Sequence, residues 1–331
     1  MSWLTTTAPR QPVFERVSTI FERVQANVRT RTGQAEFAFG IPPLDAATHG
    51  LPKGKVTIIA SRVSEGKTSL GLQVATHLAV SGKTVAFVSL EDDRESIVER
   101  LFCQTTRTDH AHLMMGQPEW ERHPEILPVF DRLKLVVLDN FGYNFHELEA
   151  VMQTLDPKPD TVIVDYVQMV DQRERESEYE AVSRFVRHAK VFAETHKIGM
   201  VLLSQINRAG ARDGRPELHH LANCGRLEQV ANLVLLMFTP HYYEAESFDY
   251  DAGSGQGMQT CPSDYVELMV AKNKTGPRGI VVPLRFVGSQ YRFEPWGEDE
   301  RTRIHRSDFA ARITGDTEPA VFHDDGGDAA N

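Results

Sequence analysis

Residues 58–70 read IIASRVSEGKTSL and place a glycine, a lysine and a threonine in direct succession, Gly66-Lys67-Thr68. The triplet matches the end of the phosphate-binding pattern G-x-x-x-x-G-K-[ST], whose first glycine is replaced here by Ser61. In that pattern main-chain N–H groups surround the phosphates, the lysine reaches the β and γ phosphates, and the hydroxyl binds Mg²⁺. The stretch is therefore a damaged loop, a chance match or a variant of a nucleotide-binding loop.

The flanking residues favour a working loop. Residues 55–61 (KVTIIAS) read as a buried strand, and a helix is expected from Lys67 to a glycine at its end. A sharp turn from strand to helix is the setting that phosphate binding requires. We expect Gly66 to lie close to phosphate, where a Cβ would intrude, while Ser61 is tolerated. The predicted nucleotide-binding residues of the loop are Ser64, Glu65, Gly66, Lys67, Thr68 and Ser69.

Polar residues at the ends of other apolar runs are the candidates for the remaining chemistry. Asp139 ends LVVLD and Asp165 follows VIV; either can complete the magnesium shell, and periodicity does not choose between them. Glu91 ends FVSLE and can act as a general base towards water, or can cap a helix. Gln205 ends MVLLSQ and can sense the γ phosphate or bond to a loop.

From Lys55 onwards the chain alternates strands with helices. The near-continuous apolar strands indicate burial on both faces of a parallel α/β sheet. Three later segments have no long helix between them, and we expect them to be additional antiparallel strands at the far side of the sheet. The predicted strands are 55–61, 84–91, 134–139, 160–169 and 198–205, the predicted helices 67–79, 94–103, 145–155 and 178–196, and the later segments 230–240, 265–275 and 279–288.

Composition limits the class of protein. The chain has 331 residues, 41% hydrophobic and 25% charged, which is typical of a globular protein. It has no apolar run of about 18 residues and no apolar signal-peptide core, so we expect a cytoplasmic protein without membrane contact. Three scattered cysteines do not indicate zinc or a disulfide framework. A net charge of −10 argues against a protein coated in nucleic acid, but allows DNA contact through a few loops.

Both ends of the chain differ from the middle. Residues 11–28 place apolar side chains at three- and four-residue steps, which predicts an amphipathic helix that packs on its own domain or on a neighbouring copy. The glycine-rich segment 248–264 is expected to be a surface loop. Residues 297–331 carry nine Asp and Glu against four Lys and Arg and no hydrophobic period, which predicts a disordered tail.

Taken together, these motifs resemble the motor domain of DnaB-type replicative helicases, within the RecA-like P-loop ATPases. The resemblance covers about residues 11–294, and its segments occur in the family's order. It also accounts for Ser61, because this family often lacks the first glycine, so the loop is a variant. The segments are GIPPLDAATHGLPKGKVTIIASRVSEGKTSLGLQVA (40–75), FVSLE (87–91), VIVDYVQM (162–169), VLLSQINR (201–208), RLEQVANLVLLM (226–237) and VAKNKTGPRG (270–279).

The resemblance implies a role for each candidate. Asp165 becomes the magnesium-side aspartate together with Thr68, Glu91 the catalytic glutamate, and Gln205 the link from the γ phosphate to the DNA-contacting loops. Such enzymes form hexameric rings that bind ATP between subunits, and the neighbouring subunit supplies basic residues. Lys272 and Lys274 lie in the matching segment.

Three features depart from the family. The second basic position is usually arginine, and Lys274 offers a point charge in place of a planar fork, so we expect weaker transition-state stabilisation. The DNA loop usually carries an Arg-Glu pair, where this chain has ANCG at 222–225. We expect the family's N-terminal collar domain to be absent, with only a linker-like helix at 11–28 in its place; in the family that helix packs on the adjacent motor.

Two loops are the candidates for DNA contact, which in a translocating enzyme is made to phosphates regardless of sequence. The first is 171–180, with Arg173 and Arg175. The second, 207–226, directly follows Gln205, so that a γ-phosphate signal can reach it. Its predicted DNA-binding residues are Arg208, Arg212, Arg215, Asn223, Gly225 and Arg226.

The sequence thus predicts an α/β, RecA-like P-loop ATPase with a mainly parallel sheet, an antiparallel extension and an N-terminal linker helix. The expected parts are a linker (1–39), a motor domain (40–296) and an acidic tail (297–331). The predicted function is an ATP- and Mg²⁺-dependent helicase that forms a homo-hexameric ring on single-stranded or forked DNA, with primase, loader or polymerase as further partners. We expect a bacterial, phage or plasmid setting. The alternatives are a filament-forming, RecA-like DNA-binding ATPase and a nucleotide-switched assembly protein.

Overall fold

The protein, described here from a computed structural model, forms two compact units, residues 1–36 and 37–331. In the first unit, helix α1 (Val17–Arg29) begins later than the predicted residue 11; residues 11–14 lie outside the described part. Its apolar stripe faces solvent, with Val17, Phe21 and Val28 82%, 57% and 50% exposed. The structure describes residues 15–29, 35–139, 144–206, 215–221, 225–241 and 262–297.

The second unit is built on a single sheet, whose strands within the described residues follow the order β3-β2-β4-β5-β1-β6-β7-β8-β9. The pairs from β3 to β6 are parallel and those from β6 to β9 are antiparallel. This confirms the predicted fold class. The strands are β1 (Val56–Ser61), β2 (Val85–Ser89), β3 (Leu135–Asp139), β4 (Thr161–Asp165), β5 (Gly199–Gln205), β6 (Leu233–Phe238), β7 (Tyr265–Asn273), β8 (Val281–Val287) and β9 (Arg292–Pro295).

The expectation that all three late segments are antiparallel was wrong for β6, which pairs parallel with β1. A parallel pair requires a crossover of a dozen or more residues, usually with a helix. Residues 206–232 supply that crossover, although its helix α9 (Gly225–Val230) has only six residues. Leu227 of α9 is fully buried in the same cluster as α8. The sequence pattern predicted no helix between residues 205 and 230, so a parallel crossover was not expected there.

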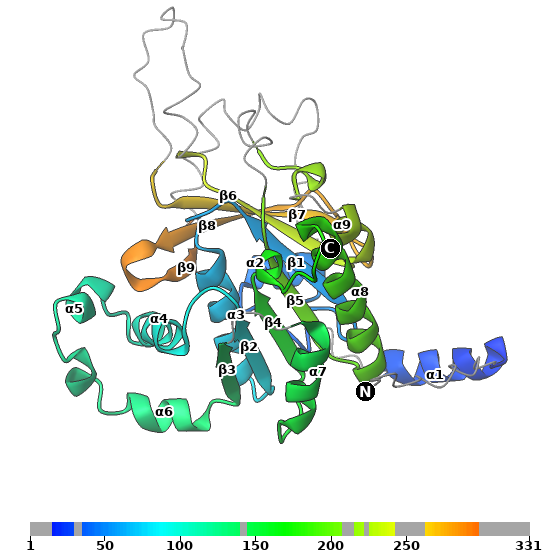
Figure 1. The fold of residues 1–331 in the computed structure, drawn as a ribbon, viewed down its shortest axis with the longest axis horizontal. Helices are drawn as coiled ribbons and strands as arrows, with labels where there is room; N and C mark the ends of the chain where they lie inside the picture. The colour runs from blue at the N-terminus through cyan, green and yellow to red at the C-terminus, as the bar shows by residue number, and fades with distance from the viewer. Residues whose placement is uncertain are drawn as a thin grey trace, which may run out of the picture. The chain divides into compact units, whose positions relative to one another are not determined.

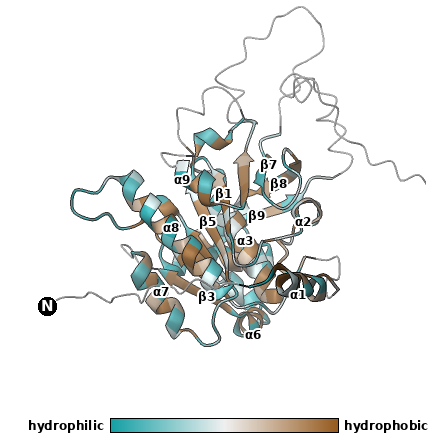
Figure 2. Cartoon of the chain, turned by 90° about the vertical axis from the view of Figure 1, so that its right-hand side faces the viewer, coloured by the Kyte–Doolittle hydropathy of each residue, from teal (hydrophilic) through white to brown (hydrophobic). Residues whose placement is uncertain are grey.

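Helices cover both faces of the sheet (Figure 1). One hydrophobic cluster lies beneath α7 (Phe145–Thr154), α8 (Glu178–His196) and α9, and the other beneath α2 (Pro42–Thr48), α3 (Lys67–Val80) and α4 (Arg94–Thr106). Figure 2 shows the matching change from hydrophobic to hydrophilic colour across α8. Burial on both sides explains why the strands are apolar throughout.

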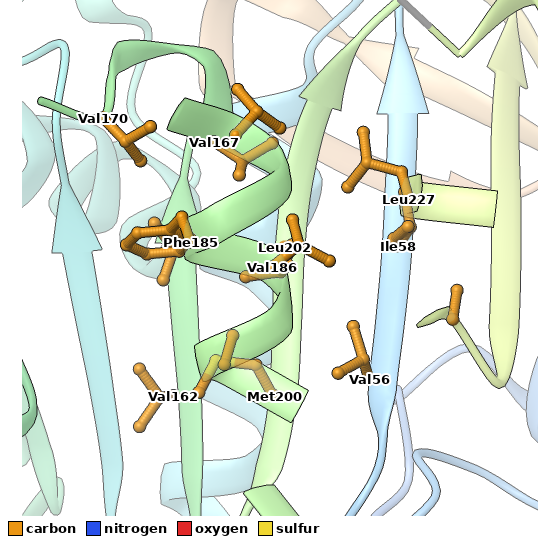
Figure 3. Packing of buried hydrophobic residues seen from close by; sticks show 14 of the residues in the cluster. Val56, Ile58, Val162, Val167, Val170, Phe185, Val186, Met200, Leu202 and Leu227 are labelled. Carbon is orange, nitrogen blue, oxygen red and sulfur yellow. The ribbon is translucent and has the colours of Figure 1, made fainter. Parts of the chain in front are cut away.

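Helix α8 shows how local sequence sets an element. Ser177 and Glu180 form a capping box at its start, and Lys197 ends it in a left-handed conformation at φ 56°. The buried face of the helix places Phe185 and Val186 against Val162 and Leu202 of the sheet (Figure 3). The helix is thereby fixed above β4 and β5, whose ends carry candidate site residues.

Several short elements were not expected from the pattern. They include α2, β9 and the connection between α4 and β3, which contains α5 (His110–Met114), η1 (Glu119–Arg122) and α6 (Ile126–Arg132). In Figure 1 this connection lies to the left of the sheet, in cyan. It leaves large apolar side chains in solvent: Met114, Met115, Trp120 and Leu127 are between 57% and 73% exposed.

The packing predicts that substitutions at two positions of α8 differ in their effect on the free energy of unfolding. Phe185 is 2% exposed and Val191, on the same helix, is 41% exposed. Phe185→Ala should lower the free energy of unfolding by about 3–5 kcal/mol, because it removes buried apolar area and leaves a cavity. Val191→Ala should change it by less than about 1 kcal/mol. Urea unfolding followed by circular dichroism measures both; equal losses in the two variants would contradict the assigned core.

Candidate active site

The loop between β1 and α3 has the conformation of an anion-binding turn. Ser64 and Gly66 have positive φ values of 67° and 87°, and Gly66 is the N-cap of α3. No side chain caps this 14-residue helix. Successive N–H groups in such a turn, together with the uncapped first turn of a helix, form a site for phosphate.

The glycine at 66 has a structural reason besides the predicted approach to phosphate. A Cβ at this position would lie 2.9 Å from Phe293 and 3.0 Å from Phe286. These two rings stack with centroids 4.5 Å apart and an interplanar angle of 22°. Gln73 of α3 fixes β9 beside the loop, because its side chain bonds to both the N–H (2.8 Å) and the carbonyl (2.9 Å) of Phe293.

Glu65, predicted to contact nucleotide, directs its side chain into the protein and is 2% exposed. Its Oε2 accepts the N–H of Arg62 at 3.0 Å and its Oε1 the N–H of Thr239 at 3.4 Å. Thr239 directly follows β6. The carboxylate therefore shapes the loop and ties it to a neighbouring strand.

Lys67 and Asp165 form a buried ion pair across the site. Lys67 Nζ lies 2.6 Å from Asp165 Oδ1, and their side chains are 11% and 1% exposed. The same ammonium lies 4.4 Å from the ring centroid of Tyr166. Thr68, on the next position of the helix, is half-buried, and Ser69 is buried with its carbonyl bonded to Gln104. Charges this close in a dry setting interact strongly, so the pair fixes the lysine over the end of β4.

Asp139, the other candidate for the magnesium shell, has a different partner. It ends β3 and lies 2.8 Å from Arg94 of α4, and its carboxylate also accepts the N–H of Arg94. Asp139 and Asp165 flank Ser89 of β2 on opposite sides. Of the two aspartates, Asp165 is the one that contacts Lys67.

Glu91 follows β2 at the same edge. Leu90 donates its N–H to the carbonyl of Asp165 at 2.6 Å, which holds the residue before Glu91 against β4. Burial raises the pKa of the Glu91 carboxyl above its ordinary value; Lys67 opposes this and Asp165 adds to it. A nearby ion pair, Arg100 with Asp92 at 2.6 Å, fixes the turn that follows.

Gln205 ends β5, directly opposite Ser61 in the sheet register. Its main chain is held by Gln168, whose side chain accepts the N–H of Gln205 at 3.2 Å and donates to Ser204 Oγ at 2.9 Å. Gln205, Glu91, Asp165 and the phosphate-binding loop thus lie at the carboxyl ends of neighbouring parallel strands, where ligands bind in open α/β sheets.

Lys272 and Lys274 lie towards the other end of the sheet. Lys274 donates its N–H to the carbonyl of Asn232, and Asn232 donates to that of Val56, so Lys274 is level with the start of β1. Ser61 is five residues further along, about 16 Å at strand rise. Lys274 is exposed, while burial, with Lys274 nearby, lowers the pKa of Lys272, which bonds to the carbonyl of Glu228.

The DNA-binding candidates are only partly described. Arg208, Arg212 and Asn223 lie outside the described residues. Gly225 begins α9, where a Cβ would have open space. The guanidinium of Arg215 lies 2.6 Å from Glu267 of β7.

Arg226 and Arg173, one from each candidate loop, line one groove of about 440 Å³ beside α8. Arg184 and Arg187 of α8 complete its basic wall beside the ring of His188, and the sequence pattern did not identify these three residues. Glu176 partly offsets the charge, because it pairs with Arg184 at 2.7 Å. The spacing of apolar residues predicted helix α8. It did not predict that the solvent-facing side of this helix lies beside α9, which depends on the fold.

Metal-binding clusters and membrane-spanning helices are both absent from the described part of the chain. Among these residues, no group of three or more His, Cys, Asp and Glu side chains is arranged to hold a metal ion. Within the same ranges, every helix is too short or too polar to cross a bilayer.

The chain is similar in sequence to curated replicative DNA helicases. The chain is 24% identical over 294 residues to the replicative DNA helicase DnaC of Bacillus subtilis (strain 168), covering 85% of this chain and 62% of the relative. It is 28% identical over 291 residues to the replicative DNA helicase DnaB of Leifsonia xyli subsp. xyli (strain CTCB07), covering 85% and 61%. The chain therefore spans about three fifths of the length of these curated relatives.

Solved structures show the same fold. The ATPase domain of G40P superposes with a TM-score of 0.74 at 21% identity, over 86% of this chain and all of that domain. A DnaB-like replicative helicase, described with its interactions with primase, gives 0.72 at 21% identity, over 86% of this chain and 68% of that one. The profile of the DnaB-like helicase C-terminal domain matches residues 37–295, which is most of the chain. The chain therefore belongs to the DnaB-like helicase C-terminal domain family.

Proposed function

We propose that this chain is an ATP-hydrolysing motor of the replicative-helicase type that assembles as a homo-hexameric ring and translocates on single-stranded DNA. The observation that carries the proposal is the position of the catalytic candidates. The phosphate-binding loop, Asp165 and Glu91 lie at one end of the sheet and Lys274 at the other. One chain does not bring these groups together, whereas a head-to-tail interface between two copies does.

The residues at the carboxyl edge fit ATP and Mg²⁺. The main-chain amides from Ser64 to Ser69 surround the phosphates, and Lys67 reaches the β and γ phosphates. Thr68 and Asp165 would hold Mg²⁺, which when bound would supply positive charge against the phosphates. Because Lys67 contacts Asp165 in the structure, binding requires the lysine to exchange this carboxylate for phosphate oxygens. The exchange leaves Asp165 available for the metal.

Glu91 orients and deprotonates the attacking water, and Gln205 senses the γ phosphate. The raised pKa of Glu91 brings this carboxylate closer to the working pH of a general base. Gln205 is followed by Ile206, which forms an isolated antiparallel bridge with Leu221. A shift at Gln205 therefore reaches the base of the second DNA loop within one residue.

Lys272 and Lys274 act on the ATP of the adjacent copy. Lys274 is exposed and suited to cross an interface, and as a lysine it places a point charge near the γ phosphate. Lys272 is half-buried and bonded to α9, so it orients the segment that carries Lys274.

Assembly uses the exposed stripe of α1. The stripe includes Val17, Phe21 and Val28, which are 82%, 57% and 50% exposed, and a single short helix needs a surface on which to bury such a stripe. We assign that surface to a neighbouring copy, on the connection from α4 to β3 where Met114, Trp120 and Leu127 are exposed. The linker would then comprise residues 1–39, the motor 40–296 and the acidic tail 297–331.

DNA runs along the groove beside α8. Arg173, Arg187 and Arg226 offer exposed guanidinium groups to phosphates, and Tyr179, 45% exposed, offers a ring on which a base can stack. The family relationship does not favour the filament-forming alternative. A cytoplasmic setting and contact with primase follow from the helicase assignment.

The proposal makes Lys67 indispensable. Lys67→Ala should lower ATP hydrolysis by about 100-fold or more, because no other described side chain places a cation against Asp165. Phosphate release is measured with and without single-stranded DNA, and unwinding on a forked duplex. Lys55→Ala is the control, since Lys55 forms only an exposed pair with Glu194, and it should stay within about twofold. If Lys67→Ala hydrolysed ATP at the wild-type rate, the assignment of the nucleotide site would be wrong.

The proposed role of Glu91 predicts the effect of a substitution at this position and the pH dependence of ATP hydrolysis. A general base must be ionised, so hydrolysis falls as pH drops through the pKa of Glu91. Because that pKa is raised, the acid limb of kcat should have a midpoint above the ordinary value of 4.5. Glu91→Gln should retain ATP binding, lose about 10²–10⁴-fold in kcat and lose the limb. Glu95→Gln, on an exposed first-turn residue of α4, is the control. An unchanged limb in the Glu91→Gln variant would exclude this role.

Catalysis between copies is tested by complementation. Lys67→Ala and Lys274→Ala should each be inactive alone. Mixed in equal amounts they should recover about a quarter of wild-type ATPase, because about one seam in four then pairs an intact Lys67 with an intact Lys274. Each variant mixed with itself is the control. If the mixture stays inactive while each variant still assembles, Lys274 does not act in trans.

A further inference from the structure

Arg215 and Glu267 form an ion pair that lies inside the protein. Arg215 Nη2 is 2.6 Å from Glu267 Oε1, and the side chains are 15% and 4% exposed. The hydroxyl of Tyr265, itself buried, donates to the same carboxylate oxygen at 3.3 Å. Strand alternation places Tyr265 and Glu267 on the face of the sheet that α8 covers. The guanidinium therefore points into the fold, and Arg215 is not among the residues that line the basic groove.

Stability does not explain this pair. Desolvation raises the pKa of Glu267, so the ionised carboxylate is costly to bury even beside an arginine. Within the described residues, Arg215 Nε and Glu267 Oε2 have no hydrogen-bond partner. A buried pair with incomplete hydrogen bonding adds little net stability compared with apolar residues, whereas its short contact constrains the position of Arg215.

The pair fixes one end of a short segment whose other end is also anchored. Residues 215–221 begin at Arg215 and end at Leu221, which bridges to Ile206. Leu221 and Ile206 are 4% and 2% exposed. The segment is therefore held by β7 at its start and by the residue after Gln205 at its end.

The same strand edge is tied to the phosphate-binding loop. Glu267 lies opposite Phe238 in the sheet register, and the next residue, Thr239, donates its N–H to Glu65. Glu65, which shapes the loop, and Glu267, which holds Arg215, thus lie against neighbouring residues of the chain. Glu65 accepts a hydrogen bond from Thr239, and Glu267 is the strand partner of Phe238. The start of the segment and the nucleotide site share one rigid support.

We propose that Arg215 and Glu267 are positioning residues that hold segment 215–221 in place for nucleic-acid binding, and that Arg215 does not itself contact a phosphate. This rests on the proposed function and replaces the direct DNA contact expected for Arg215 from the sequence. The neighbouring Arg226, exposed in the groove, keeps the role of a phosphate contact.

The positioning role is tested without DNA by amide hydrogen exchange. The amides of His220 and Leu221 bond to the carbonyls of Glu217 and Leu218. Glu267→Gln should accelerate their exchange about tenfold, because the segment loses its anchor, while amides of α3 keep their rates. Arg226→Gln is the matched control and should leave the segment unchanged. Unchanged exchange in folded Glu267→Gln protein would overturn the proposal, and Arg215→Gln provides the same comparison if the Glu267 variant does not fold.

The absence of direct contact is tested by the salt dependence of binding to a fluorescent oligothymidine. Arg215→Gln, Glu267→Gln and the double variant should each weaken binding about tenfold with the slope of log Kd against log salt unchanged, because no phosphate contact is lost. Arg226→Gln should reduce the slope by about 0.7. A reduced slope for Arg215→Gln together with wild-type binding by Glu267→Gln would show a direct contact instead. If the wild type does not bind the oligonucleotide, the helicase proposal fails, and hydrogen exchange still decides the positioning role.

Discussion

The contact between Lys67 and Asp165 joins the two halves of the candidate nucleotide site. It draws the first turn of α3 onto the end of β4, and the backbone bond from Leu90 to Asp165 brings in the turn that carries Glu91. Asp165 is buried and Lys67 is largely covered, so water competes weakly for either charge. The pair therefore persists until an anion binds Lys67 more strongly than the carboxylate of Asp165 does. The charged phosphates of a nucleotide are such anions.

The parallel order of the sheet explains why one chain holds only part of the chemistry. Parallel strands gather Ser61, Gln205, Asp165 and Glu91 at one edge, and the antiparallel return of β7 carries Lys272 and Lys274 away from it. In the proposed assembly, a second copy would return a cation to the phosphates. Such a shared site would make hydrolysis in one subunit sensitive to the position of the next, which is the physical requirement for the sequential action proposed for a ring.

The part of the site that follows from local pattern was predictable. A strand, a Gly-Lys-Thr turn and a helix specify a phosphate cradle, because the backbone geometry is fixed within about ten residues. The strands with their order along the chain, α8 and the antiparallel β7 and β8 were also predicted correctly. The direction of β6 was not, since a six-residue helix gave too weak a signal for a crossover. The choice between Asp139 and Asp165 came from family resemblance, because both end apolar strands.

Sequence by itself determined the class of chemistry and the membership of the protein in its family, through residues that act on their immediate neighbours. Tertiary structure alone decided which distant groups meet. It placed Glu65 towards Thr239, Gly66 beneath Phe286 and Phe293, and Arg215 against Glu267; the first pair is separated by 174 residues and the last by 52. No local period encodes such contacts, because they depend on the order and register of strands that only the complete sheet defines.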